Sequence, residues 1–182
     1  MTSESTSRHK AAAAAGPNTR SVPCSVITVS DTRTPATDKG GDLVVRLLTE
    51  AGHTLVDRTI VPDNPDAIAK AIEMRLADPR VRALLLTGGT GIAPRDTTIE
   101  VVRARLTAEM PGFGELFRML SYQHVGASAM LSRAVAGLVA HNAAAGGDTF
   151  VFAMPGSVNA VEVAMTKLIV PELSHLVWER SR

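Results

Sequence analysis

The chain has 182 residues, a length that suits one well-buried domain, and 45% of them are hydrophobic while only 3% are aromatic. A formal charge of +1, with one Trp and one Tyr, offers neither a basic field nor a stacking surface, which argues against nucleic acid as a partner. The single cysteine, Cys24, excludes an intrachain disulfide, and the five histidines lack the spacing of a zinc site.

The first 20 residues are rich in Ser, Thr and Ala and contain a run of five alanines before Gly16. This run is too short and too weak for a signal sequence, and no segment reaches the about 20 apolar residues that a membrane span requires. We therefore predict a disordered tail over 1–20, one domain over 21–182, and a cytoplasmic protein with no membrane partner.

Strands and helices alternate along the rest of the chain. Apolar and β-branched runs predict five strands, at 21–29, 54–61, 81–86, 135–140 and 149–154. Cys24 lies in the first of these and is expected to be a buried small hydrophobe. Helical spacing follows the first two strands, where Gly52 ends one helix and Asn64 with Pro65 begins the next. This order predicts an α/β fold with a doubly wound, mostly parallel sheet covered by helices.

The second half of the chain carries further helical patterns. Ile99, Val102 and Leu106 predict a helix that begins near Thr97 or Thr98. The segment 110–122 is amphipathic, and its apolar stripe fits either a subunit interface or an ordinary core. An Ala-rich loop is expected at 142–147, and helices fill the chain after the last strand up to position 178.

The most informative segment is a glycine-rich loop that directly follows an apolar strand. Three glycines within four positions allow positive φ angles and let main-chain N–H groups approach a ligand closely. Arg95 can clamp an anion and Asp96 can hold Mg²⁺ between phosphate oxygens, and the helix that follows would add its positive end. The spacing fits neither a P-loop nor a dinucleotide fingerprint. A tight strand-to-helix turn with one ion pair is the alternative. The loop reads Thr87-Gly88-Gly89-Thr90-Gly91.

Polar residues also follow other predicted strands. In a doubly wound sheet the ligand crevice lies outside the carboxyl ends of the strands, so these segments are expected on one rim. Asp63 could equally be a turn or cap residue, and Asp31 could form an Asx-turn. The segments expected on this rim are Ser30-Asp31, Asp63, the glycine loop with Asp96, and Pro155-Gly156-Ser157.

Taken together, these segments resemble the MoaB/MogA family of molybdopterin-binding proteins of molybdenum cofactor biosynthesis. The resemblance covers about residues 22–178, and the run 168–173 with His175 is closer to the MoaB branch. It is carried by Ser30-Asp31-Thr32-Arg33 with Asp38-Lys39-Gly40, Val61-Pro62-Asp63, the whole run 87–98, Glu109-Met110-Pro111-Gly112-Phe113-Gly114-Glu115, Leu131-Ser132-Arg133 and Met154-Pro155-Gly156-Ser157.

The resemblance implies a three-layer α/β fold, a homotrimer or homohexamer, and Mg-ATP-dependent adenylylation of molybdopterin with release of pyrophosphate. It further implies hand-over of the product to a molybdenum-insertion protein. Asp63 and Asp96 match the family's two important aspartates and are the expected catalytic residues and Mg²⁺ ligands. The expected ligands of molybdopterin and ATP are Ser30, Asp31, Thr87, Gly88, Gly89, Thr90, Gly91, Arg95, Ser132, Arg133, Pro155, Gly156 and Ser157.

Two other functions fit parts of the pattern. A non-catalytic molybdopterin carrier or scaffold would need no pair of aspartates, and an unrelated flavodoxin-like nucleotide-binding module would leave the segment 111–114 unexplained. Arg133 could equally be a solvated or interface arginine. Ile99 and Val158-Asn159 depart from the family pattern, which often has Pro there, and could reshape the helix start and the rim loop.

Overall fold

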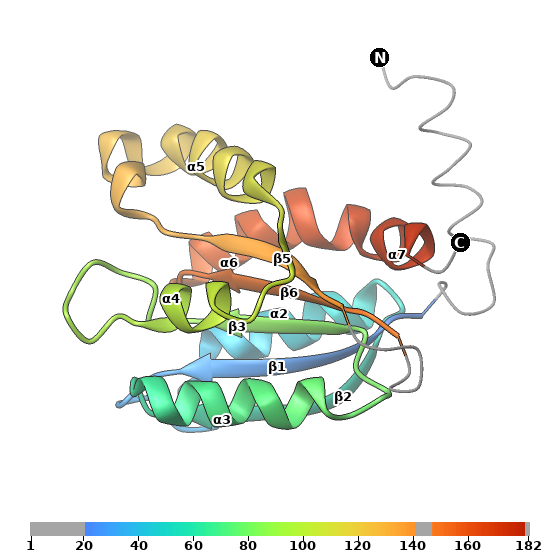
Figure 1. Ribbon diagram of the computed structural model, residues 1–182. Coiled ribbons are helices and arrows are strands. Elements are labelled where there is room, and N and C mark those ends of the chain that lie inside the picture. The colour runs from blue at the N-terminus through green and yellow to red at the C-terminus, as the bar shows by residue number, and fades with distance from the viewer. Residues whose placement is uncertain (1–20, 141–146, 181–182) are drawn as a thin grey trace, which may run out of the picture.

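The computed structural model describes residues 21–140 and 147–180. Its six strands form one sheet in the order β2-β1-β3-β6-β5-β4 (Figure 1). The strands β1, β2, β3 and β6 are parallel, while β5 runs antiparallel to both of its neighbours. The strands are β1 Pro23–Val29, β2 Thr54–Val61, β3 Ala83–Thr87, β4 Ala108–Glu109, β5 Val135–Val139 and β6 Thr149–Met154.

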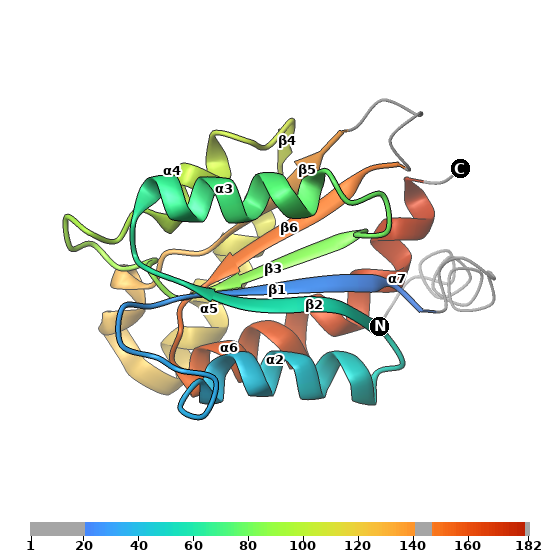
Figure 2. The same cartoon turned by 90° about the horizontal axis from the view of Figure 1, so that it is seen from below.

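Helices cover both faces of this sheet and give the three layers that were expected. Figure 2 shows α3 and α4 on one face and α2, α6 and α7 on the other. Each face has its own buried apolar cluster, and the larger one also includes Phe113 and Phe117 of α5. The helices are α2 Lys39–Glu50, α3 Pro65–Leu76, α4 Thr98–Arg103, α5 Pro111–Val125, the 3₁₀ helix η1 Gly126–Leu131, α6 Val158–Ala164, the π-helix η3 Met165–Ile169 and α7 Val170–Glu179.

The predicted fold class and all five predicted strands are confirmed, with strand ends that shift by two residues or fewer. Local chemistry explains the helix boundaries. The Asn64 side chain accepts hydrogen bonds from the first amides of α3, with Pro65 at its first turn. Gly52, just after α2, has a φ of +84°, which a glycine adopts without strain. Cys24 is fully buried, and burial raises the pKa of its thiol to about 12.

Two details differ from the expectation. The two-residue strand β4 was not predicted, because it is too short to show an alternating pattern. The helix α4 begins at Thr98 as predicted but ends at Arg103, so Leu106 lies beyond it and packs against the core from a loop. With only six residues, α4 contributes little dipole to the loop before it.

The ambiguous segment 110–122 divides its side chains between core and surface. Phe113 and Phe117 are buried, whereas Leu116, Met119 and Tyr122 are exposed on the outer side of α5. The homo-oligomer stays a prediction. Within the part of the chain that the structure describes, no helix is long and apolar enough to cross a bilayer. The predicted tail 1–20, most of the loop 142–147 and the last two residues lie outside the described residues.

Candidate functional site

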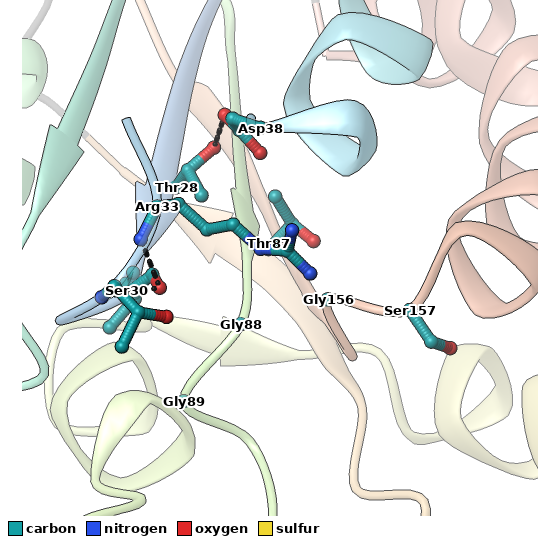
Figure 3. A pocket seen from close by; sticks show the side chains of 11 residues that line it. Thr28, Ser30, Arg33, Asp38, Thr87, Gly88, Gly89, Gly156 and Ser157 are labelled. Carbon is teal, nitrogen blue, oxygen red and sulfur yellow. Dashed lines mark hydrogen bonds between the residues drawn. The ribbon is translucent and has the colours of Figure 1, made fainter. Parts of the chain in front are cut away.

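A polar pocket lies at the carboxyl ends of β1, β3 and β6 (Figure 3), which is the rim where the sequence places the ligand crevice. Its volume is about 370 Å³. The structure brings together here Ser30, Thr87, Gly88, Gly89, Gly156 and Ser157 of the expected site residues. Four other polar residues also line the pocket, namely Thr28, Thr32, Arg33 and Asp38.

The turn after β1 forms one wall of the pocket. The Ser30 hydroxyl accepts hydrogen bonds from the backbone N–H groups of Thr32 (3.2 Å) and Arg33 (3.1 Å), which folds the chain back toward the sheet. The Arg33 side chain reaches over the pocket in Figure 3, and its Nη1 donates to the Thr37 carbonyl oxygen at 3.0 Å. Arg33 lies in the matching segment 30–33, but no local pattern indicates that its side chain reaches over the pocket.

Asp38 anchors this wall to the sheet. Its buried carboxylate accepts hydrogen bonds from Thr28 Oγ1 (2.6 Å), Arg58 Nη2 (2.6 Å) and Gly41 N (2.9 Å), so both oxygens are occupied. Burial alone would raise the pKa of Asp38, but the hydrogen bonds from these three partners outweigh it and lower the pKa. A Cβ at Gly41 would lie 2.2 Å from Asp38 Oδ2, so this contact requires glycine.

The glycine loop forms the floor of the pocket, and the backbone there leaves no room for side chains. Gly88 and Gly89 have φ angles of +96° and +60°. A Cβ at Gly88 would lie 2.3 Å from the Val29 carbonyl oxygen, and one at Gly156 would lie 3.2 Å from Gly88 Cα. Thr87 Oγ1 donates to the Pro155 carbonyl oxygen at 3.3 Å, which joins the loops after β3 and β6.

A group of carboxylates lies beside this loop. Asp63 follows β2, and its N–H donates to Asp31 Oδ1 at 3.0 Å. Burial raises the pKa of Asp63, and the negative charges of Asp96 and Asp31 raise it further, while Arg95 acts in the opposite direction. Asp63 Oδ1 is buried and has no hydrogen-bond partner among the described residues. It lies 2.9 Å from the position that a Cβ would take at Gly89.

Asp96 completes this group from the far end of the loop. Its Oδ2 accepts a hydrogen bond from Ala93 N at 2.9 Å and would lie 2.5 Å from a Cβ at Gly91, so the third glycine makes room for this carboxylate. The first amide of α4, on Thr98, donates to the Gly89 carbonyl oxygen at 3.1 Å and therefore closes the loop rather than facing a ligand.

The donor set suits a magnesium ion. The carboxylates of Asp63 and Asp96 offer hard oxygen atoms, and the buried oxygen of Asp63 has no hydrogen-bond partner among the described residues. Mg²⁺ is typically held by one or two carboxylates and takes its remaining ligands from phosphates and water. Residues 21–140 and 147–180 contain no cluster of three or more His, Cys, Asp or Glu side chains that could hold a metal ion without further ligands.

The remaining expected site residues lie around or behind this pocket. Arg95 is exposed at the tip of the loop, near enough to Asp63 to lower its pKa. Ser132 and Arg133 line a separate cavity of about 240 Å³ on the other side of the glycine loop, next to α4. Ser157 caps α6, where its Oγ accepts a hydrogen bond from Ala160 N at 3.3 Å, and it is exposed at the pocket edge.

Comparisons with known proteins agree over almost the whole domain. A family model described as "Probable molybdopterin binding domain" matches residues 25–175. Molybdenum cofactor biosynthesis protein B of Bacillus subtilis (strain 168) is 50% identical over 159 residues, which cover 87% of this chain and 89% of that protein. The protein of the same name from Staphylococcus carnosus (strain TM300) is 49% identical over 166 residues, covering 90% and 93%.

Solved structures give the same result. The crystal structure of a molybdenum cofactor biosynthesis protein B matches with a TM-score of 0.83 and 48% identity, and the match covers 89% of this chain and 97% of that one. The tungsten cofactor synthesizing protein MoaB from Pyrococcus furiosus matches with a TM-score of 0.76 and 33% identity, covering 90% and 99%.

Proposed function

The chain belongs to the MoaB/MogA family of molybdopterin-binding proteins of molybdenum cofactor biosynthesis, and on this premise we propose that it adenylylates molybdopterin with Mg-ATP. The products are adenylyl-molybdopterin and pyrophosphate. The observation that carries the proposal is the buried, unpartnered oxygen of Asp63 in a group with Asp96, directly beside a phosphate-type glycine loop. A pocket that only held a pterin would have no use for two repelling carboxylates.

The reaction is a nucleotidyl transfer. An oxygen of the terminal phosphate of molybdopterin forms a bond to the α-phosphorus of ATP, and the bond from the α-phosphorus to the bridging β-oxygen breaks. Pyrophosphate leaves with that electron pair. Because a phosphate nucleophile is already ionised at neutral pH, the protein needs no general base and contributes mainly by positioning and by offsetting charge.

The pocket and the carboxylate group beside it each have a role in this proposal. Asp63 and Asp96 would hold Mg²⁺, which would supply positive charge against the phosphates. Arg95 and the glycine-loop N–H groups after Gly88, whose own N–H donates to the Met154 carbonyl oxygen, bind phosphate oxygens. Arg33, which lines the pocket, adds a cation that was not among the expected ligands. Ser30, Asp31 and Ser157 offer hydrogen bonds to the pterin or the nucleotide.

The partners expected from the family complete the proposal. Exposed apolar side chains on the outer side of α5, at Leu116, Met119 and Tyr122, support self-association into a trimer or hexamer. Adenylyl-molybdopterin, once formed, is handed to a molybdenum-insertion protein.

The test is product formation from molybdopterin and Mg-ATP, with the wild type beside Asp96→Asn. We expect turnover in the wild type and a loss of several orders of magnitude in the variant. Asp66→Asn is the matched control, because Asp66 is an exposed aspartate in the first turn of α3, outside the pocket. A wild type that binds molybdopterin tightly but forms no product would refute the proposal and favour the carrier function.

A further inference from the structure

Arg133 lies behind the glycine loop, between η1 and β5, and its guanidinium is directed at the loop backbone. Nε donates to the Thr90 carbonyl oxygen at 3.0 Å, and Nη2 donates to the carbonyl oxygens of Gly91 at 2.6 Å and Asp96 at 2.8 Å. Carbonyl groups from both ends of the irregular segment 90–96 therefore converge on one side chain.

Glu100, on the exposed side of α4, holds the guanidinium in this orientation. Its carboxylate pairs with Nη1 of Arg133 and also lies 3.4 Å from Nη2. The planar fork of an arginine has five N–H donors, and these contacts use at least four of them. Arg133 is thus occupied by the loop and by Glu100, and its donors do not face the pocket at the carboxyl ends of the strands.

The position of the Asp96 carboxylate depends on this arrangement. Arg133 fixes the backbone of Asp96 through its carbonyl oxygen, and Ala93 N fixes the side chain through Oδ2. Between these contacts, residues 91–97 form no helix or strand that could hold the carboxylate in place by itself. The segment is therefore held by these side-chain contacts together with two backbone hydrogen bonds, from Asp96 N to the Ala93 carbonyl oxygen at 2.8 Å and from Thr98 N to the Gly89 carbonyl oxygen.

We infer that Arg133 and Glu100 form a positioning pair that fixes Asp96 opposite Asp63. This inference rests on the proposed function, in which the two aspartates hold Mg²⁺, and it replaces the expectation that Arg133 binds substrate phosphate. Residues that orient metal ligands typically contribute about 10–100-fold to metal affinity or activity. Lysine cannot replace arginine here, because a single ammonium group lacks the planar fork that spans three carbonyl oxygens.

The test compares Arg133→Lys and Glu100→Gln with the wild type, and Arg103→Lys is the matched control. Arg103 is exposed, lines the same back cavity and pairs with Glu109 rather than with the loop. Hydrogen exchange is measured at the amides that close the loop, those of Ala93, Asp96 and Thr98, and at core amides of β3 and β6. Binding of Mg²⁺ is measured by calorimetry with a non-hydrolysable ATP analogue, and the steady-state constants for Mg²⁺ and molybdopterin are measured separately.

In Arg133→Lys we expect faster exchange at the loop amides and about tenfold weaker Mg²⁺ binding, with core exchange and the molybdopterin KM unchanged. Glu100→Gln should change the same quantities less, and the control should change none. Unchanged loop exchange and Mg²⁺ affinity would overturn the inference, and a raised KM for molybdopterin or ATP alone would identify Arg133 as a direct ligand. If the wild type forms no product while loop exchange and Mg²⁺ binding respond as expected, the proposed function fails and the positioning pair stands.

Discussion

Replacement of Asp63 by Asn should make the protein more stable and inactive at once. The Asp63 carboxylate is half-buried, its pKa is raised by burial and by two neighbouring negative charges, and its buried oxygen has no hydrogen bond to lose. Asn has almost the same shape, so the substitution leaves no cavity. The charge and its repulsion from Asp96 and Asp31 disappear, whereas the proposed Mg²⁺ ligand is lost.

The expected gain in the free energy of unfolding follows from the environment of Asp63. Single stabilising substitutions, including those that remove unfavourable charge, commonly yield about 0.5–2 kcal/mol, and the partial exposure of Asp63 places the expected value near the middle, at about 1 kcal/mol. For a domain of this size such a gain raises Tm by about 2–4 °C.

The raised pKa of Asp63 also fixes how the stability difference between variant and wild type changes with pH. Because the pKa of Asp63 is higher in the folded than in the unfolded protein, the folded state binds the proton more tightly. The wild type therefore has its full relative stability below the unfolded pKa of about 4, and it loses that stability as the pH rises through the folded pKa. The advantage of the variant should therefore vanish at acid pH.

Calorimetric unfolding in metal-free buffer, at pH 7 and again below pH 4, measures this difference. Addition of Mg-ATP should stabilise the wild type, by about 2.7 kcal/mol at a ligand concentration of 100 Kd, and should leave Asp63→Asn almost unchanged. Asp66→Asn, at an exposed aspartate nearby, should behave as the wild type in both respects. A variant that melts below the wild type at pH 7 would refute the reasoning and show that Asp63 is a structural cap.

Three further predictions concern the frame of the site and the assembly. Asp38→Ala removes the carboxylate that accepts from Thr28, Gly41 and Arg58, and of its ion pairs Arg58 retains only the one with Asp42. The loss of these buried hydrogen bonds should cost about 1–3 kcal/mol in the free energy of unfolding, measured by urea denaturation. Gly88→Ala forces a Cβ against backbone at a positive φ and should abolish nucleotide binding in calorimetry, whereas Gly112→Ala, where a Cβ meets nothing within 4 Å, should have little effect. Met119→Glu, on the exposed side of α5, should shift the sedimentation coefficient from that of the proposed trimer or hexamer toward that of a monomer.

Local sequence patterns were enough to predict most of the fold, because the strands are continuous apolar runs bounded by turn residues. Such runs are typical of parallel strands that are buried on both faces, and their ends set the rim on which the pocket lies. The two-residue strand β4 has no pattern of its own, because only pairing with β5 makes it a strand. The early end of α4 likewise depends on the turn that leads to β4 and not on the spacing of its apolar residues.

The direction in which a polar side chain points could not be predicted in this way. Arg33 and Arg133 both lie in motifs that resemble the family, yet the structure places one over the pocket and the other behind the glycine loop. Their surroundings come from elements far apart in the chain. The spacing of residues along one segment contains no information about a carbonyl oxygen that is 42 positions away, such as that of Gly91 beneath Arg133.

The environments of two aspartates, Asp38 in the pocket wall and Asp63 beside the glycine loop, show how structure separates a frame residue from a candidate functional one. Both oxygens of Asp38 accept hydrogen bonds, from Thr28, Arg58 and Gly41, and these bonds lower its pKa and hold the carboxylate in the pocket wall. Asp63 has a buried oxygen without a partner, and burial together with the neighbouring negative charges raises its pKa, which is the environment that a bound cation would relieve. Both follow the first two strands in sequence and both lie in family motifs. Their hydrogen bonds distinguish the residue that holds the pocket wall from the residue whose buried oxygen is left without a partner beside the glycine loop.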